Sequence, residues 1–124
     1  MILIFGGAYQ GKLEYAKKQY RISENAIYKC VKEIIYGKML YYDFHKWIYN
    51  ISQKENMDEL LQDFLNNNPD AIIICEDISC GVVPVDEDLR KWREDCGRSL
   101  GIISQRADVV IRLFCGIPTV LKPL

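Results

Sequence analysis

Eight residues near the start of the chain have the composition of a phosphate-binding loop. They are Gly6, Gly7, Ala8, Tyr9, Gln10, Gly11, Lys12 and Leu13, and they are called the phosphate loop below. The segment fits the pattern Gly-x-x-x-x-Gly-Lys but lacks the Ser or Thr that usually follows. Glycines let backbone N–H groups converge on phosphate oxygens at a helix N-terminus, while the Lys ammonium reaches the outer phosphates. A glycine-rich turn with an unrelated Lys is the alternative, and the apolar run that precedes the segment favours the loop.

Two carboxylates occupy the positions that magnesium ligands take in such proteins. Asp43 and Glu76 each come at the end of a short apolar run, and these runs are predicted to be strands. A carboxylate placed there holds magnesium directly or through water. Leu13 has no side-chain oxygen, so any magnesium would depend on this pair. Either residue could instead be a helix cap. We expect Lys12, Asp43 and Glu76 to form the catalytic set.

Three further polar side chains are candidates for the same site. His45, the single histidine, lies two residues after Asp43 among aromatic neighbours, which favours a packed or surface residue over a catalytic one. Arg90 and Arg93 are three positions apart near the start of a predicted long helix, on the side of the expected site. Contact with phosphate or substrate and simple solvation of a polar helix face fit this spacing equally well.

Composition narrows the classes of protein that remain. A chain of 124 residues, 49% of them apolar, predicts one domain, 1–124, with its own core. A net charge of −1 argues against general attraction to nucleic acid or anionic membrane. No apolar run approaches the roughly 20 residues of a spanning helix, so we expect a soluble, cytoplasmic protein. Five cysteines without a Cys-x-x-Cys pair predict structural thiols rather than disulfides or a zinc site.

The elements that would hold these groups alternate between strand and helix. Apolar runs predict strands over 2–5, 39–42, 71–75, 109–114 and 119–122. Helical spacing and capping residues predict helices over 12–20, from Ser23 to Gly37, from Asn56 to about residue 66, and over 86–107. In the second of these helices Ile27, Val31, Ile34 and Ile35 would share one face. The order predicts a three-layer α/β domain of the P-loop NTPase type, with a mainly parallel sheet and a short antiparallel strand at the end.

Several segments together resemble the adenosylcobinamide kinase / adenosylcobinamide-phosphate guanylyltransferase family. The resemblance covers the first 12 residues and is nearly continuous from Ala71 to Lys122. It rests on Glu76 through Gly81-Val82-Val83-Pro84, on Leu89-Arg90-Lys91-Trp92-Arg93-Glu94, on Gly97, on Ala107-Asp108, and on Gly116-Ile117-Pro118. The segment Asp43-Phe44-His45-Lys46-Trp47 is similar to the family's Asp-Cys-Leu-Thr-x-Trp with one residue missing.

The resemblance implies a step in cobalamin assembly. Family members phosphorylate adenosylcobinamide from ATP or GTP and then transfer GMP through a covalent histidine. In this chain the stretch between the phosphate-loop helix and Asp43 is shorter and contains no histidine, so the resemblance does not carry guanylyl transfer over. The family usually oligomerises, which implies a homo-oligomer here. Kinase activity is the favoured interpretation, with ATP or GTP and magnesium as expected cofactors. The alternatives are a nucleotide- or corrinoid-binding module without catalysis, regulatory or structural in role, and a remnant that binds nothing.

Overall fold

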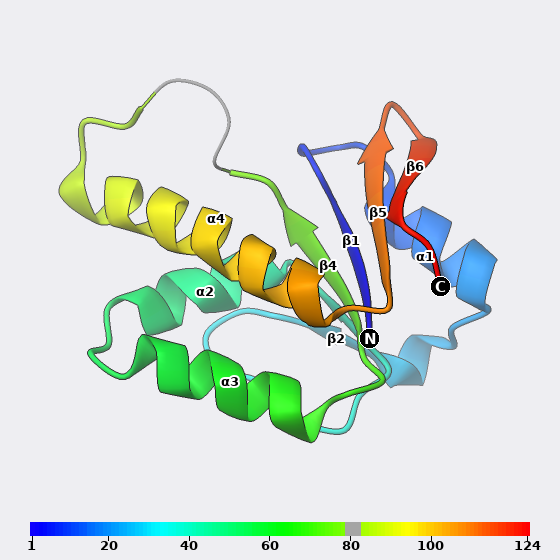
Figure 1. Cartoon of the computed structure of the whole chain (residues 1–124), viewed down its shortest axis with the longest axis horizontal. Helices are drawn as coiled ribbons and strands as arrows, with labels where there is room; N and C mark the ends of the chain where they lie inside the picture. Colours follow the sequence, from blue (N-terminus) through cyan, green and yellow to red (C-terminus); the bar gives the residue numbers. More distant parts are fainter. Residues whose placement is uncertain (79–82) are drawn as a thin grey trace.

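A six-stranded sheet forms the centre of the molecule in the computed structural model, which describes residues 1–78 and 83–124 (Figure 1). The strand order is β2-β3-β4-β1-β5-β6. Neighbouring strands are parallel except β5 and β6, which form an antiparallel hairpin. The strands are β1 (Ile2–Gly6), β2 (Ile27–Lys29), β3 (Leu40–Tyr42), β4 (Ile72–Glu76), β5 (Val109–Phe114) and β6 (Ile117–Lys122).

Helices cover both faces of this sheet and make the fold a three-layer one. One face carries α1 (Lys12–Tyr20), and the other carries α2 (Phe44–Ser52), α3 (Met57–Asn67) and α4 (Glu87–Arg106) (Figure 1). A 3-10 turn, η1, spans Glu24–Ala26. None of the described helices combines the length and the apolar character needed to cross a membrane.

Alternate residues of the central strands build two separate cores. Leu3 and Ile73 point toward α2, α3 and α4, whereas Ile4, Ile72 and Ile74 point toward Ala16 of α1. Successive side chains of a strand face opposite sides of a sheet, so a strand that is buried on both faces is apolar throughout. This is the physical reason that the short apolar runs in the sequence indicate strands of a parallel sheet.

The predicted α/β class, the mainly parallel sheet and the terminal antiparallel strand are confirmed. The structure also contains the expected strands and three of the four expected helices, within a few residues of their predicted ends. At the start of α4, the carboxylate of Asp86 accepts hydrogen bonds from the backbone N–H groups of Asp88 and Leu89, as a helix N-cap does. Buried Cys30, Cys75 and Cys96 are free thiols and Cys115 is exposed, whereas Cys80 lies outside the described residues.

The prediction of a helix from Ser23 to Gly37 is wrong. Its apolar residues have helical spacing, but Ile27, Tyr28 and Lys29 instead pair with β3 as a parallel edge strand, and residues 30–39 cross back without a helix. Val31 and Ile35, which the helix would have buried, are exposed. β-Branched and aromatic residues lose side-chain freedom in a helix and fit a sheet well, so pairing with β3 outweighs the local periodicity.

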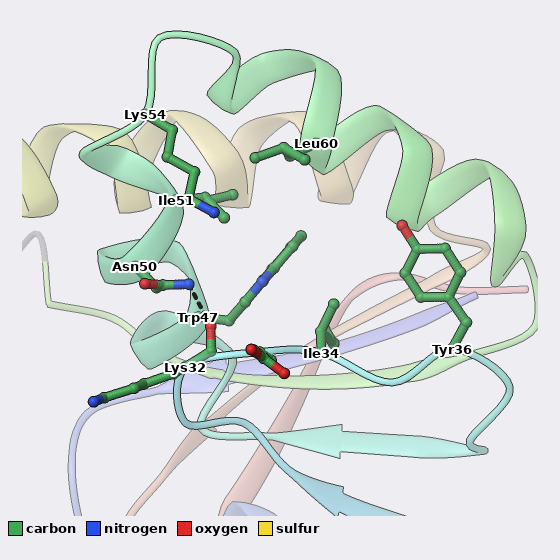
Figure 2. A pocket seen from close by; sticks show the side chains of 9 residues that line it. Lys32, Ile34, Tyr36, Trp47, Asn50, Ile51, Lys54 and Leu60 are labelled. Atoms are coloured by element: carbon green, nitrogen blue, oxygen red, sulfur yellow. Dashed lines mark hydrogen bonds between the residues drawn. The ribbon is translucent and has the colours of Figure 1, made fainter.

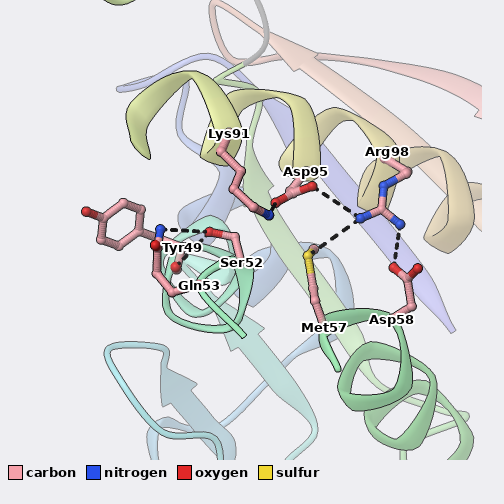
Figure 3. A network of polar contacts seen from close by, with 8 residues as sticks. All are labelled: Tyr49, Ser52, Gln53, Met57, Asp58, Lys91, Asp95 and Arg98. Carbon is pink, nitrogen blue, oxygen red and sulfur yellow. Dashed lines mark hydrogen bonds and ion pairs between the residues drawn. The ribbon is translucent and has the colours of Figure 1, made fainter. Parts of the chain in front are cut away.

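A polar network holds α4 against the start of α3 (Figure 3). The buried carboxylate of Asp95 accepts hydrogen bonds from Lys91 Nζ at 2.7 Å and from Arg98 at 3.2 Å. The same guanidinium reaches Asp58 and the sulfur of Met57 on the neighbouring helix. Two cations beside one carboxylate compensate for its burial. The network therefore positions the long helix relative to α3.

Candidate functional site

The phosphate loop connects the end of β1 to the beginning of α1, as the sequence predicts. Gly11 has a φ of 79° and Tyr9 a φ of 58°, so the chain turns twice through the left-handed region before the helix begins. The side chain of Lys12 bends back over the loop, and its Nζ donates a hydrogen bond to the Gly7 carbonyl oxygen at 2.7 Å. The loop thus combines an ammonium group with the positive end of a helix.

Three contacts with neighbouring segments hold the loop in place. A Cβ at Gly6 would lie 2.3 Å from the carbonyl oxygen of Leu113 on β5, so only glycine fits at this position. The backbone N–H of Asp77 donates to the Gly6 carbonyl oxygen at 2.8 Å. The side chain of Gln10 accepts a hydrogen bond from the backbone N–H of Cys115 in the β5–β6 turn. The loop is therefore held on both sides.

The two predicted carboxylates lie at the same edge of the sheet as the loop. Glu76 is the last residue of β4 and is in register with Gly6 on the adjacent strand. Asp43 follows β3, one strand further along, and has a φ of 57° at the start of α2. It forms an ion pair with Lys46, whose Nζ lies 3.1 Å from Asp43 Oδ2.

A small pocket joins Asp43 to the phosphate loop. Its volume is about 180 Å³, and it is lined by loop residues together with Glu14, Tyr42, Asp43 and Ile74. Pockets that enclose whole drug-sized ligands are usually about 300 to 1,000 Å³, so this one suits a phosphate group better than a complete nucleotide. Glu76 is not among the residues that line it. The structure therefore brings Asp43 and Lys12 together directly, while Glu76 lies beside the base of the loop.

The structure also brings His45 to Glu76, a contact that the sequence analysis missed. The imidazole Nε2 lies 3.2 Å from Glu76 Oε2, and Nδ1 accepts a hydrogen bond from the backbone N–H of Glu76 at 3.2 Å. The His45 side chain is only 5% exposed. Burial lowers the pKa of His45, while the charges of Glu76 and Asp43 partly offset that effect. The apolar residues Phe44, Trp47, Ile48 and Ile51, spaced as in a helix, were the available signal for this inward-facing segment.

The two candidate arginines have different surroundings. Arg90 is exposed, and its Nη1 donates to the carbonyl oxygen of Val85 at 2.7 Å, within the loop that precedes its own helix. Arg93 is half-buried, and its Nη1 is buried without a hydrogen-bond partner in the described part of the chain. It lies one turn before Cys96, which faces β4. A buried guanidinium nitrogen without a partner is costly. Arg93 is thus the better candidate for an anion contact.

A magnesium ion fits this site only in the company of phosphate oxygens. Leu13 packs against the core beneath α1 and offers no oxygen, and one oxygen of each carboxylate already has a cationic or N–H partner. Residues 1–78 and 83–124 contain no group of three or more His, Cys, Asp and Glu side chains suited to a metal. Magnesium commonly binds through one or two carboxylates plus substrate phosphates and water. Asp43 and Glu76 fit that arrangement.

A larger pocket lies elsewhere, between the crossover at residues 32–36 and helices α2 and α3 (Figure 2). Its volume is about 490 Å³, and Trp47, Ile51 and Leu60 supply much of its apolar wall. Asn50 closes one side by donating a hydrogen bond to the Lys32 carbonyl oxygen. This pocket contains neither the phosphate loop nor the carboxylates. Pocket volume therefore does not select the candidate site, which rests instead on the chemistry of the phosphate loop.

Comparison with known protein families identifies the lineage of the chain. Residues 30–121 match the sequence profile of the cobinamide kinase / cobinamide phosphate guanyltransferase family. The chain belongs to this family. The match includes Asp43, Glu76, Arg90 and Arg93, and it begins after the phosphate loop. Comparison with curated proteins gives no match. Membership of the family supports a nucleotide-binding transferase of cobalamin biosynthesis in general terms, and the mixed α/β fold agrees with it.

Proposed function

We propose that this protein binds ATP or GTP at the phosphate loop and transfers the terminal phosphoryl group to the hydroxyl of a cobinamide. The observation that carries the proposal is the pocket lined by both Lys12, at the start of α1, and Asp43, which follows β3. Membership of the cobinamide kinase family supports the choice of acceptor. Adenosylcobinamide is the specific acceptor we propose.

The phosphate loop would bind the outer phosphates of the nucleotide. Its backbone N–H groups meet the positive end of α1, and Lys12 can exchange its present acceptor, the Gly7 carbonyl oxygen, for phosphate oxygens. The Gly7 carbonyl oxygen is neutral, whereas phosphate oxygens are negatively charged, so pairing the ammonium with phosphate favours this exchange. Arg93 of α4 does not line this pocket, so a contact with substrate would require its guanidinium to leave the buried position in which Nη1 has no partner among the described residues.

The reaction needs few groups beyond those that position the phosphates. The acceptor oxygen would attack the terminal phosphorus, forming one P–O bond as the bond to the bridging oxygen breaks and a nucleoside diphosphate leaves. The proton of the acceptor hydroxyl would pass to Asp43 or Glu76. Magnesium, when bound with the nucleotide, supplies positive charge that stabilises the phosphates. The same two carboxylates, in their proposed catalytic role, would hold it.

We do not extend the proposal to guanylyl transfer through a protein histidine. His45 is the chain's single histidine, and both of its ring nitrogens contact Glu76. A nucleophilic nitrogen must be free to reach the phosphorus of GTP. The side chain is also almost fully buried. Kinase activity without the second half of the family's reaction is therefore the function proposed.

A binding module without catalysis is the second candidate, and Leu13 favours it. In working phosphate loops a hydroxyl at this position holds magnesium against the phosphates. Here an aliphatic side chain packs into the core beneath α1 instead. Nucleotide or corrinoid binding would then serve regulation or assembly. Magnesium dependence of nucleotide binding separates this candidate from the kinase.

We also propose that the protein assembles as a homo-oligomer. Apolar side chains are exposed on the β5–β6 hairpin, where Phe114, Ile117, Val120 and Leu121 are each more than half exposed. Exposed apolar side chains that gather on one edge hairpin are a feature of many protein–protein contacts. Light scattering of the purified chain measures its molecular mass in solution. A mass above 14.4 kDa would support the assembly, and a monomer at micromolar concentration would contradict it.

Calorimetric titration combined with a turnover assay tests the kinase proposal. ATP and GTP are titrated with and without magnesium, and adenosylcobinamide is then added while phosphorylated product and nucleoside diphosphate are quantified together. The kinase predicts metal-linked nucleotide binding and equal amounts of the two products. Nucleotide or corrinoid binding without product would favour the binding module. No binding of either nucleotide or of adenosylcobinamide at millimolar concentration would reject both candidates.

A further inference from the structure

His45 makes an unusual pair of contacts with one residue. Its Nδ1 accepts a hydrogen bond from the backbone N–H of Glu76, and its Nε2 lies 3.2 Å from the carboxylate of the same residue. A neutral imidazole has one N–H donor and one acceptor nitrogen. Because Nδ1 is the acceptor here, the hydrogen belongs on Nε2, from which it is donated to Glu76 Oε2. The backbone and the side chain of Glu76 are thus both fixed by a single ring.

The ring of His45 is itself held in place by α4. Trp92 Nε1 donates a hydrogen bond to the His45 carbonyl oxygen at 2.7 Å. The two rings stack with centroids 6.2 Å apart and planes at 23°. A ring that is packed on one face and hydrogen-bonded at both nitrogens has little freedom to rotate. The imidazole is therefore a rigid support between α2, β4 and α4.

We propose that His45 is a positioning residue that holds the Glu76 carboxylate in one orientation for phosphoryl transfer. With Oε2 occupied by His45, the remaining oxygen, Oε1, has no hydrogen-bond or ion-pair partner among the described residues. That oxygen is the one available to a magnesium–phosphate group or to the proton of the acceptor. The inference rests on the proposed function, and it explains how the Glu76 carboxylate is kept in one orientation.

The charged groups around the His45 imidazole belong to the candidate site, which indicates that the ring is part of that site and not only of the hydrophobic core. The pKa of His45 responds to the charges of Glu76, Asp43, Lys46 and Lys12, after the larger effect of burial. Lys12 belongs to the phosphate loop and Asp43 to its pocket. A histidine that only filled the space between α2 and α4 would need no acceptor at the end of β4. Its contact with Glu76 therefore connects the interior to the candidate site.

The structural part of the proposal can be tested in the ligand-free protein by NMR. His45 is the single histidine, so its imidazole ¹⁵N signals identify themselves. At neutral pH we expect the Nε2–H tautomer, and three-bond couplings of Glu76 that report one side-chain rotamer. In His45→Leu and in the smaller His45→Asn, the Glu76 couplings should average over rotamers. An Nδ1–H tautomer, or Glu76 couplings that are the same in native and variants, would overturn the proposal.

The functional part is tested by a double-mutant cycle in the phosphoryl-transfer assay. Loss of a residue that orients a metal-binding side chain typically costs on the order of 10- to 100-fold in affinity or activity. We therefore expect His45→Asn to lower kcat by at least about tenfold with little change in KM for nucleotide. His45→Gln should restore much of the rate, because its amide places an N–H donor near the position of Nε2. In a Glu76→Gln background the His45→Asn change should alter kcat less than about twofold.

The outcomes separate this proposal from the proposed function. An equal loss from His45→Asn with and without the Glu76 carboxylate would show that His45 acts through general packing, and would overturn its positioning role. Urea unfolding of each variant shows whether it is folded, and His45→Asn serves if the larger change to Leu prevents folding. If the native protein neither binds nor turns over nucleotide, the proposed function fails. The NMR comparison then still shows whether His45 fixes the side-chain rotamer of Glu76.

Discussion

Gly6 and Leu113 approach each other so closely that a Cβ on Gly6 would lie 2.3 Å from the Leu113 carbonyl oxygen. The two residues belong to adjacent parallel strands, and the phosphate loop begins at Gly6. The obstacle is backbone rather than a flexible side chain, so it cannot move aside without disturbing β5. The first glycine of the loop is thus required by packing between strands, independently of any ligand.

Substitution of Gly6 should therefore destabilise the fold. We expect Gly6→Ala to lower the free energy of unfolding by roughly 1 to 3 kcal/mol, the usual cost of overpacking. The matched control is Gly7→Ala, whose Cβ would meet only the Gln10 side chain at 3.9 Å. Thermal unfolding should show a lower midpoint for Gly6→Ala and a nearly native one for Gly7→Ala. Equal midpoints for the two variants would contradict the argument.

Lys12→Ala should weaken nucleotide binding. The ammonium already donates a hydrogen bond to the Gly7 carbonyl oxygen, so it is poised over the loop. Loss of a charge-assisted contact should cost on the order of 1.5 to 3 kcal/mol of binding free energy. Lys18→Ala removes the same charge from an exposed position of the same helix and serves as the control. Calorimetry measures both, and unchanged affinity of Lys12→Ala would mean that nucleotide binds elsewhere.

The hydroxyl that is missing from the phosphate loop gives a third prediction. Leu13→Ser should make nucleotide binding or phosphoryl transfer more dependent on magnesium, because it restores an oxygen ligand beside the phosphates. Leu13 packs against the core beneath α1, so the change also removes apolar contact. Leu13→Ala removes that contact without adding an oxygen and is the matched control. A native protein with strong magnesium dependence, and no gain in Leu13→Ser over Leu13→Ala, would show that other groups hold the metal.

Incubation with labelled GTP should leave no acid-labile GMP adduct on the protein. Formation of the adduct requires a free imidazole nitrogen, whereas both nitrogens of His45 are engaged by Glu76 in an almost fully buried ring. Mass spectrometry of the intact chain before and after acid treatment detects such an adduct. Stoichiometric labelling at His45 would refute this prediction and would reopen the guanylyltransferase half of the family's reaction.

Stability should decrease as the pH falls below about 6.5. An exposed histidine in the unfolded chain takes up a proton near that pH. Burial lowers the pKa of His45 in the folded protein, so the unfolded state binds more protons between the two pKa values. Urea unfolding at a series of pH values from 7.5 to 5 measures the effect. His45→Gln removes the titrating group, and its stability should change less over that range. Parallel curves for the two proteins would argue against the lowered pKa.

The phosphate loop and the long helix α4 are predictable from local sequence for a clear reason. A buried strand of a parallel sheet is apolar throughout, and glycines followed by Lys at its end need no distant partner to be recognised. Asp86 likewise satisfies the first N–H groups of α4 within its own segment. The positions of Asp43 and Glu76 at the strand ends follow from the same apolar runs. These features depend on neighbours along the chain.

The segment from Ser23 to Gly37 shows where local pattern is insufficient. Ile27, Val31, Ile34 and Ile35 have the spacing of a helix, yet Ile27 is in a strand that pairs with Leu40. Hydrogen bonds to β3 are available only after the sheet has formed, and periodicity along the segment contains no information about them. The crossover therefore depends on tertiary structure. Helix α2 shows the opposite situation. The helical spacing of its apolar residues is visible in the sequence, although the predicted elements do not include this helix.

The sequence by itself determined the fold class and the positions of the glycine-rich loop and of Asp43 and Glu76 at strand ends, because composition and near-neighbour spacing decide these features. Only the tertiary structure decided which carboxylate shares a pocket with Lys12 and what His45 contacts. It also decided that Arg90, rather than Arg93, donates a hydrogen bond to the loop before its own helix. His45 and Glu76 are 31 residues apart, and their contact exists because α2 packs across the end of β4. Hydrogen bonds between distant segments depend on the direction in which each side chain leaves its element, which residue type does not specify.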